Sequence, residues 1–190
     1  MSKVKMGMKA PRFAKITAEG AAALPTYDST KIITVGEAVS GALTINRANA
    51  ELYSDDGLNV KADEFSSASL ALETDGIEDD VAAAVYGAAV ASGLVTYSAG
   101  DVAPHGGLTY YTPMKDRSGA VYYKCWFFPK VQAAMGSDNA QTKASSVTFQ
   151  TANTTFTIFA CNTGAWMQTE IVESETEAVT WCETKLGKTA

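Results

Sequence analysis

Alternation of apolar and polar residues dominates the chain and predicts short β-strands over most of its length. Residues 65–73 place Ala68, Leu70 and Leu72 on one side and polar residues on the other. Between 120 and 128 both alternating sets are largely apolar or aromatic, which is typical of a strand covered on both faces. The same reasoning predicts further strands at 31–35, 41–48, 51–53, 108–114, 145–150 and 154–160.

Two segments rich in Asp and Gly predict the turns of β-hairpins. The sequence SDDG at 54–57 lies between two short strands, and DRSG at 116–119 separates the strands 108–114 and 120–128. Glycine adopts positive φ without a steric penalty, so it suits the tight turn that joins two antiparallel strands.

Two segments have helical rather than alternating periodicity. The first is predicted over 75–92, with acidic residues in its first turn and a stop at Gly93; Ile77, Val81, Val85 and Ala88 form its apolar stripe. The second is predicted over 174–187, where Ser174 and Glu177 have the spacing of a capping box. Val179, Cys182 and Leu186 share one face of this helix.

Many strands with one central and one terminal helix predict an α+β, mainly β fold. The simplest architecture is a β-sandwich or barrel flanked by helices. Without an internal repeat or linker, residues 1–190 are interpreted as a single domain, in which residues 1–30 are either an N-terminal arm or part of the core.

Composition and charge narrow the function. The chain has 190 residues, of which 46% are hydrophobic and 19% charged, as in ordinary globular domains. No apolar run reaches the ~20 residues that span a bilayer; no signal peptide is recognised, so we expect assembly in a cytoplasm. The net charge of −6 disfavours a protein that grips nucleic acid, because phosphate binding needs a basic surface. The same negative charge is compatible with a protein that lets nucleic acid slide past without binding it.

The residues that carry chemistry are few. His105 is the single histidine and lies in a predicted loop, while Cys125, Cys161 and Cys182 are far apart in the sequence. Zinc sites need clustered ligands, and acid–base catalysis needs paired groups. We therefore expect no enzyme activity, no metal and no cofactor, and we expect the cysteines to be reduced, mostly buried hydrophobic residues.

Several segments, in order along the chain, resemble one family. The residues AELYSDD at 50–56, followed by DEF at 63–65, are similar to an "A-x-L-Y-A-D-D" signature. YYKCWFFPKV at 122–131, then QTK at 141–143 and VTFQT at 147–151, are similar to "W-L-Y-K-V", "T-K" and "Y-Q-T-P". These are motifs of the major tail proteins of long-tailed, non-contractile bacteriophages. Further similar segments are PRFAK at 11–15, GEAV at 36–39, the helix 75–92 with Gly87, and EAVTWC at 177–182; Ala152 departs from the family by replacing a common proline.

The resemblance implies a tail-tube fold, in which a β-sandwich or barrel lies beside one central helix, with a C-terminal helix and an extended arm or hairpin. It implies a structural virion protein of the phage tail. Hexameric rings stack into a tube, and DNA passes through its lumen into the host cell without specific binding. The partners implied are other copies of the chain, a tape-measure protein, a tail terminator and a distal tail protein.

The resemblance also suggests roles for individual segments. The Ser- and Thr-rich strands at 66–69 and 148–157 offer a polar, uncharged face suited to a lumen. Acidic candidates for the lumen are Glu51, Asp55, Asp56, Asp63 and Glu64; alternatively, Asp55 and Asp56 form a solvated hairpin tip or a contact between rings. Candidate contacts between rings are Pro11, Arg12, Phe13, Gly136, Asp138 and Lys143.

Two other classes of function stay open at this point. One is another virion structural protein, such as a head–tail joining or capsid-associated protein. The other is a carbohydrate- or cell-surface-binding β-sandwich, in which Tyr110, Tyr111, Trp126 and Trp166 would stack on sugar rings.

Overall fold

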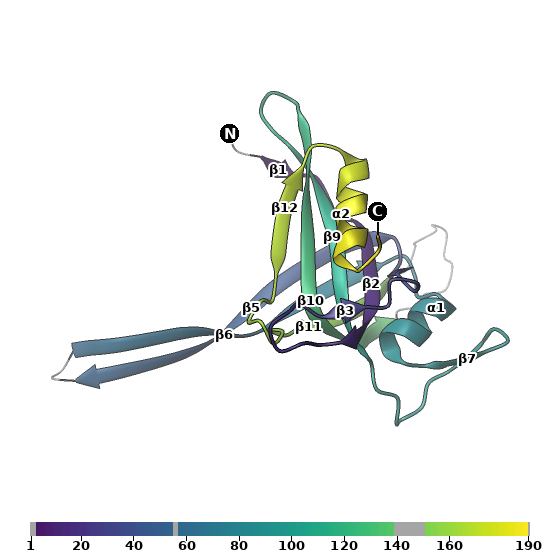
Figure 1. The fold of residues 1–190 in the computed structure, drawn as a ribbon, viewed down its shortest axis with the longest axis horizontal. Coiled ribbons are helices and arrows are strands. Elements are labelled where there is room, and N and C mark those ends of the chain that lie inside the picture. The colour runs from purple at the N-terminus through teal and green to yellow at the C-terminus, as the bar shows by residue number, and fades with distance from the viewer. Residues whose placement is uncertain (1–2, 55–56, 139–150, 190) are drawn as a thin grey trace, which may run out of the picture.

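A computed structural model describes residues 3–54, 57–138 and 151–189, and in this part the chain is mainly β (Figure 1). The strands are β1 (Val4–Lys5), β2 (Lys9–Ala18), β3 (Thr26–Tyr27), β4 (Ile33–Thr34), β5 (Ala38–Ser54), β6 (Gly57–Thr74), β7 (Ala89–Ala91), β8 (Leu94–Thr96), β9 (His105–Lys115), β10 (Val121–Asp138), β11 (Ala152–Ile158) and β12 (Gln168–Val172). The helices are α1 (Asp79–Val81), which continues as a π-helical turn (Ala82–Tyr86), and α2 (Glu175–Lys185).

One antiparallel sheet contains all the strands except β7 and β8, which pair with each other. Its order is β3-β2-β9-β10-β11-β6-β5, while β1 pairs with β9, β4 with β2 and β12 with β10. The predicted segment 145–150 lies outside the described residues, and the strands predicted at 41–48 and 51–53 are one continuous strand, β5.

The β9–β10 hairpin forms the centre of the sheet and is covered on both faces, as the sequence predicts. Tyr110 and Trp126 are cross-strand partners on one face, and Tyr111 and Cys125 are partners on the other. All four side chains are buried. In the turn, the Asp116 carboxylate accepts hydrogen bonds from the backbone N–H groups of Ser118 and Ala120, which fixes the reversal.

The main core lies on one face of the sheet and is capped by the short helical segment 79–86. It contains the predicted side chains of β6 and fully buried aromatic residues from β2, β10 and β11. The buried Tyr86 hydroxyl is hydrogen-bonded to Thr154, which ties the helical segment to β11. The largest fully buried members of this core are Phe13, Phe128, Phe156, Leu70, Leu72, Leu108 and Ile158.

Replacing Phe156 by alanine is expected to lower the free energy of unfolding by about 4 kcal/mol, because it opens a cavity in a fully buried site. Phe156→Leu retains most of the volume and is expected to cost about 1 kcal/mol. Urea denaturation followed by tryptophan fluorescence measures both values, and equal losses in the two variants would contradict this account.

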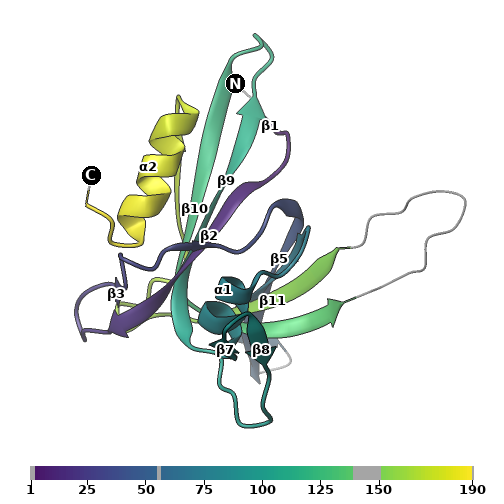
Figure 2. The same cartoon turned by 90° about the vertical axis from the view of Figure 1, so that its right-hand side faces the viewer.

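Helix α2 packs on its own chain and covers the opposite face of β9 and β10 (Figure 2). The capping box is present: Ser174 accepts a hydrogen bond from the Glu177 backbone, and the Glu177 carboxylate accepts one from the Ser174 backbone. Cys182 and Leu186 are fully buried, and the thiol of Cys125 lies 4.0 Å from the Ala178 carbonyl oxygen.

The first helix is much shorter than the predicted 75–92. It begins at Asp79 because the Asp75 carboxylate instead accepts a hydrogen bond from the Glu37 backbone N–H, at 2.8 Å. It ends at Gly87, whose φ of 77° is left-handed. Gly93, predicted as the helix stop, lies in the turn between β7 and β8 with φ of 79°. The apolar stripe is nevertheless buried at Val81, Val85 and Ala88.

Residues 9–18 are not an arm but an interior strand of the sheet. β2 pairs with β9 on one side and with β3 and β4 on the other, and both Phe13 and Ala14 are fully buried. The described residues that precede β2 include β1, which pairs with the end of β9 only through Val4 and Lys5.

Candidate assembly surface

The outward face of β5, β6, β11 and β10 forms continuous rows of small uncharged side chains. One row runs Thr44, Ser69, Thr157 and Gln132, and the next runs Ala42, Ala71, Thr155 and Ala134. We call these eight residues, with Asn46, Ser67 and Asn153, the uncharged face. The core residues Leu70, Leu72 and Phe156 occupy the alternate positions and point the other way.

The uncharged face is accessible to solvent. Its side chains are exposed or half-buried, and in the described part of the chain both helices pack elsewhere, the segment 79–86 on the main core and α2 on β9 and β10. Within 38–46, 66–74, 131–138 and 152–158 the charged residues are Glu73 and Asp138. Hydroxyl and amide groups of this kind bind water but offer no cation to a phosphate group.

Glu73 is the acid at the border of this face, and it lies opposite Ser40 and Asn153 in the ladder. Hydroxyl groups of Thr151 and Ser40 donate hydrogen bonds to its two carboxylate oxygens, at 2.5 and 2.8 Å. These donors stabilise the ionised form, with Thr151 the larger cause, and hold the pKa of Glu73 below its ordinary value.

Glu73→Gln is expected to weaken the decrease in unfolding free energy that the wild type shows as the pH falls from 6 to 3. A folded-state pKa below the unfolded value contributes stability that is present above the unfolded pKa, about 4.3, and is lost as the pH falls through the folded value. Unfolding free energies measured between pH 6 and pH 3 test this expectation. An identical pH dependence in the variant and the wild type would contradict it.

One open sheet edge borders the uncharged face. β5 pairs with β6 on one side, and no described strand pairs with its other side. Val39 and Ile45 on this strand are 56% and 46% exposed. A second, shorter edge is β12, which pairs only with β10. Such edges pair readily with another chain.

The far part of β5 and β6 projects from the body as a long two-stranded hairpin (Figure 1). It begins at a register shift between Asn46 and Arg47, the kind of irregularity that bends and twists a strand. Its residues 46–51 and 61–64 are exposed. Two ion pairs cross it, Arg47 with Asp63 at 2.8 Å and Lys61 with Glu51 at 3.4 Å.

Three of the five acids suggested for a lumen therefore do not lie on the uncharged face. Glu51, Asp63 and Glu64 belong to the projecting hairpin, and Asp55 and Asp56 lie outside the described residues. The sequence did not separate these two surfaces, because the point where the hairpin leaves the body depends on where packing ends.

The suggested contacts between rings are scattered. Phe13 is wrong as a contact residue, since it is fully buried within its own chain, and Pro11 is also buried. Arg12 is half-buried, and its Nε lies 3.9 Å from Glu183. Gly136 is exposed on β10, Asp138 is the last residue of that strand, and Lys143 lies outside the described residues.

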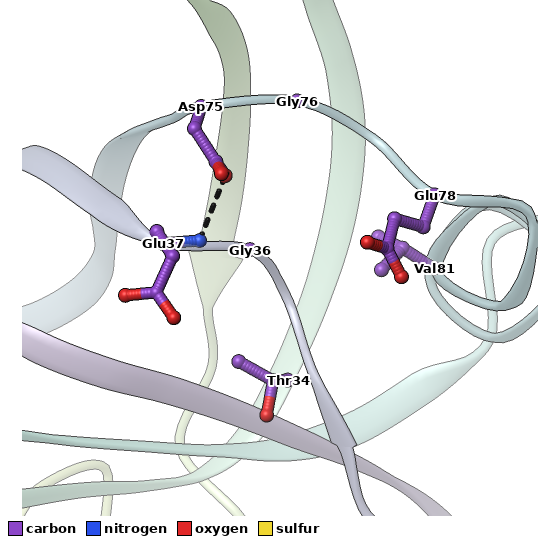
Figure 3. A pocket seen from close by; sticks show the side chains of 7 residues that line it. All are labelled: Thr34, Gly36, Glu37, Asp75, Gly76, Glu78 and Val81. Carbon is purple, nitrogen blue, oxygen red and sulfur yellow. Dashed lines mark hydrogen bonds between the residues drawn. The ribbon is translucent and has the colours of Figure 1, made fainter.

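A hollow of about 280 Å³ lies where β4 and β5 meet the start of the helical segment (Figure 3). Its lining carries the carboxylates of Glu37, Asp75 and Glu78, without a histidine, cysteine or cation. The hydrogen bond from the Glu37 N–H to Asp75 makes this a structural junction. Among the described residues, no three or more His, Cys, Asp or Glu side chains are arranged to hold a metal ion.

The remaining residues singled out in the sequence make contacts within the fold. His105 is not in a loop but is the first residue of β9, where it is exposed and packs edge-on against Phe159. The three cysteines are free and buried, as predicted. Tyr110, Tyr111 and Trp126 are less than 10% exposed, so they offer no ring face to a sugar; Trp166 stacks on Phe65.

No protein-family model matches the chain, and no curated protein matches it significantly. In the described residues no helix has the length and apolar character needed to cross a membrane.

Proposed function

We propose that this chain is the tube-forming subunit of a bacteriophage tail, a structural protein that polymerises as stacked hexameric rings around a channel for DNA. The observation that carries the proposal is the uncharged face and its position beside the open edge of β5. A face without cations lets a polyanion pass without being held. An open edge can pair with the sheet of a neighbouring copy, and this pairing makes the uncharged faces of the two copies continuous.

Ring closure accounts for an edge that would otherwise be a hazard. In a monomer, a strand as long as β5 with exposed Val39 and Ile45 invites uncontrolled pairing. In a closed ring each copy presents its β5 edge to the sheet of its neighbour, so the β5 edge does not stay open. The uncharged face then becomes the inner surface of a continuous β-lined channel.

The projecting hairpin connects one ring to the next in this arrangement. Its described side chains are exposed, and a two-stranded hairpin by itself is only marginally stable in water. A surface on a second copy would supply the missing packing. Tape-measure, tail terminator and distal tail proteins are the further partners expected of such a tube, which resides in the virion.

Negative-stain electron microscopy of the purified protein across a concentration series tests the proposal. Rings with six-fold symmetry, or tubes of uniform width, are expected, together with a large assembled species in sedimentation velocity. A chain that stays monomeric at millimolar concentration would overturn the proposal. Closed particles without a through-channel would instead favour the capsid-associated alternative.

A further inference from the structure

Three lysines gather over two aromatic rings at one end of the sheet. The ammonium group of Lys3 lies 3.4 Å from the centre of the Tyr122 ring, and those of Lys5 and Lys124 lie 4.8 and 4.3 Å from the centre of the Trp126 ring. We call these five residues the lysine–aromatic surface. It combines the β1 arm with the side of β10 that faces away from α2.

These ammonium groups have no acidic partner among the residues that the structure describes. None of the three lysines forms an ion pair with a described residue. Lys115 and Arg117 add positive charge at the same end, where the Asp116 carboxylate is engaged by the turn. The acids in the first turn of α2 lie across the sheet, since that helix packs on the Cys125 face.

Two ammonium groups that share one indole ring repel each other. Cation–π attraction of about 0.5–2 kcal/mol holds each group in place despite this repulsion. Because an anionic partner would relieve the repulsion, the accumulated positive charge favours its binding. Beside Lys5 and Trp126 lies a hollow of about 260 Å³, lined also by Met8, Val39 and Tyr110. This hollow has room for a side chain of that partner.

The chain itself carries a matching anionic element. Residues 47–64, which include the projecting hairpin, contain five acids and two bases, a net charge of −3 from Arg47 and Lys61 against Glu51, Asp55, Asp56, Asp63 and Glu64. The hairpin projects away from β1, which carries Lys5 (Figure 1). A contact between the hairpin and the lysine–aromatic surface therefore joins two copies head to tail. The overall charge of −6 disfavours a nucleic acid as the partner.

We propose that the lysine–aromatic surface is the docking site for the acidic β5–β6 hairpin of a second copy of this chain. This inference rests on the proposed function and specifies which surfaces join successive rings. The contact is heterologous, and repeated addition of copies through it produces a filament rather than a closed dimer.

Charge reversal on each side separately provides the test. Lys5→Glu/Lys124→Glu makes the docking surface acidic, and Glu51→Lys/Glu64→Lys makes the hairpin basic. Each variant alone faces like charges at every contact, and the concentration needed for stacking is expected to rise roughly thirtyfold. An equimolar mixture of the two restores opposite charges at each contact and is expected to form tubes near the wild-type concentration.

The controls separate this proposal from the others. Lys5→Arg/Lys124→Arg keeps the charge and is expected to assemble, and a chain with all four reversals is expected to assemble alone, which also shows that the reversed chains fold. Two reversed variants that each form tubes like the wild type would overturn the docking site and leave the proposed function intact. The docking site would also be overturned if neither the mixture nor the fourfold variant formed tubes. Tight, salt-sensitive binding of a labelled single-stranded oligonucleotide to the wild type would overturn it too, if Lys5→Glu/Lys124→Glu abolished that binding. A wild-type chain without rings or tubes would remove the proposed function itself.

Discussion

Ile45→Lys is expected to yield a folded chain that no longer forms rings. Ile45 is 46% exposed on the open edge strand β5, so the monomer loses little packing. In a paired edge, however, the new ammonium group would be partly buried without a partner, at a cost of roughly 3 kcal/mol per contact. A cost of this size raises the concentration needed for ring formation roughly a hundredfold, which sedimentation velocity measures directly.

Ile45→Thr is the matched control for this substitution. Threonine keeps the β-branched shape that suits a strand and adds no charge, so rings are expected near the wild-type concentration. Thermal unfolding of both variants checks that the monomer is intact. Normal rings from Ile45→Lys would place the contact between copies at another edge.

Thr155→Arg/Thr157→Arg is expected to make the assembled tube bind DNA tightly inside its channel. Both threonines belong to the uncharged face, in adjacent rows of the sheet. Two arginines in every copy would place a dense ring of positive charge along the channel, and DNA affinity is expected to rise at least about a thousandfold at low salt. Labelled duplex DNA that cosediments with tubes and resists nuclease reports binding inside the channel, and its loss above about 0.5 M salt reports the electrostatic cause.

Two control variants distinguish the channel from the outer surface. Thr155→Gln/Thr157→Gln adds length without charge and is expected to leave DNA unbound. Thr176→Arg/Thr180→Arg places the same charge on exposed positions of α2, where any bound DNA remains open to nuclease. Nuclease-resistant DNA in the second control, or none in the channel variant, would contradict the assignment of the uncharged face to the lumen.

Local signals predict some elements of this fold well. The capping box of Ser174 and Glu177 marks the start of α2 because both partners lie within one turn of helix. The β9–β10 hairpin follows from its turn and from the two apolar faces of β10. In each case the decisive contacts are close in sequence, or the alternation is strong.

Tertiary contacts decide the elements that the sequence predicts poorly. The apolar stripe of 75–92 is real, but Gly87 ends the helix, and a Cβ there would lie 2.6 Å from the Val102 carbonyl oxygen. The sequence leaves β2 ambiguous because one side of the strand pairs with β9, which is distant in sequence. Ser and Thr alternation predicts the part of the uncharged face on β6 and β11, but not its part on β5 and β10. The open edge of β5 depends on the strand order, which no local sequence pattern determines.

The register shift at Asn46 and Arg47 has a mechanical consequence for a tube built in the proposed way. Hydrogen-bonded strands around each ring would resist stretching. Along the axis the rings would be linked by two-stranded hairpins, each of which leaves the body at the register shift. The assembly would therefore be stiff in girth and compliant in bending, so that it curves between rings while the bore keeps its width.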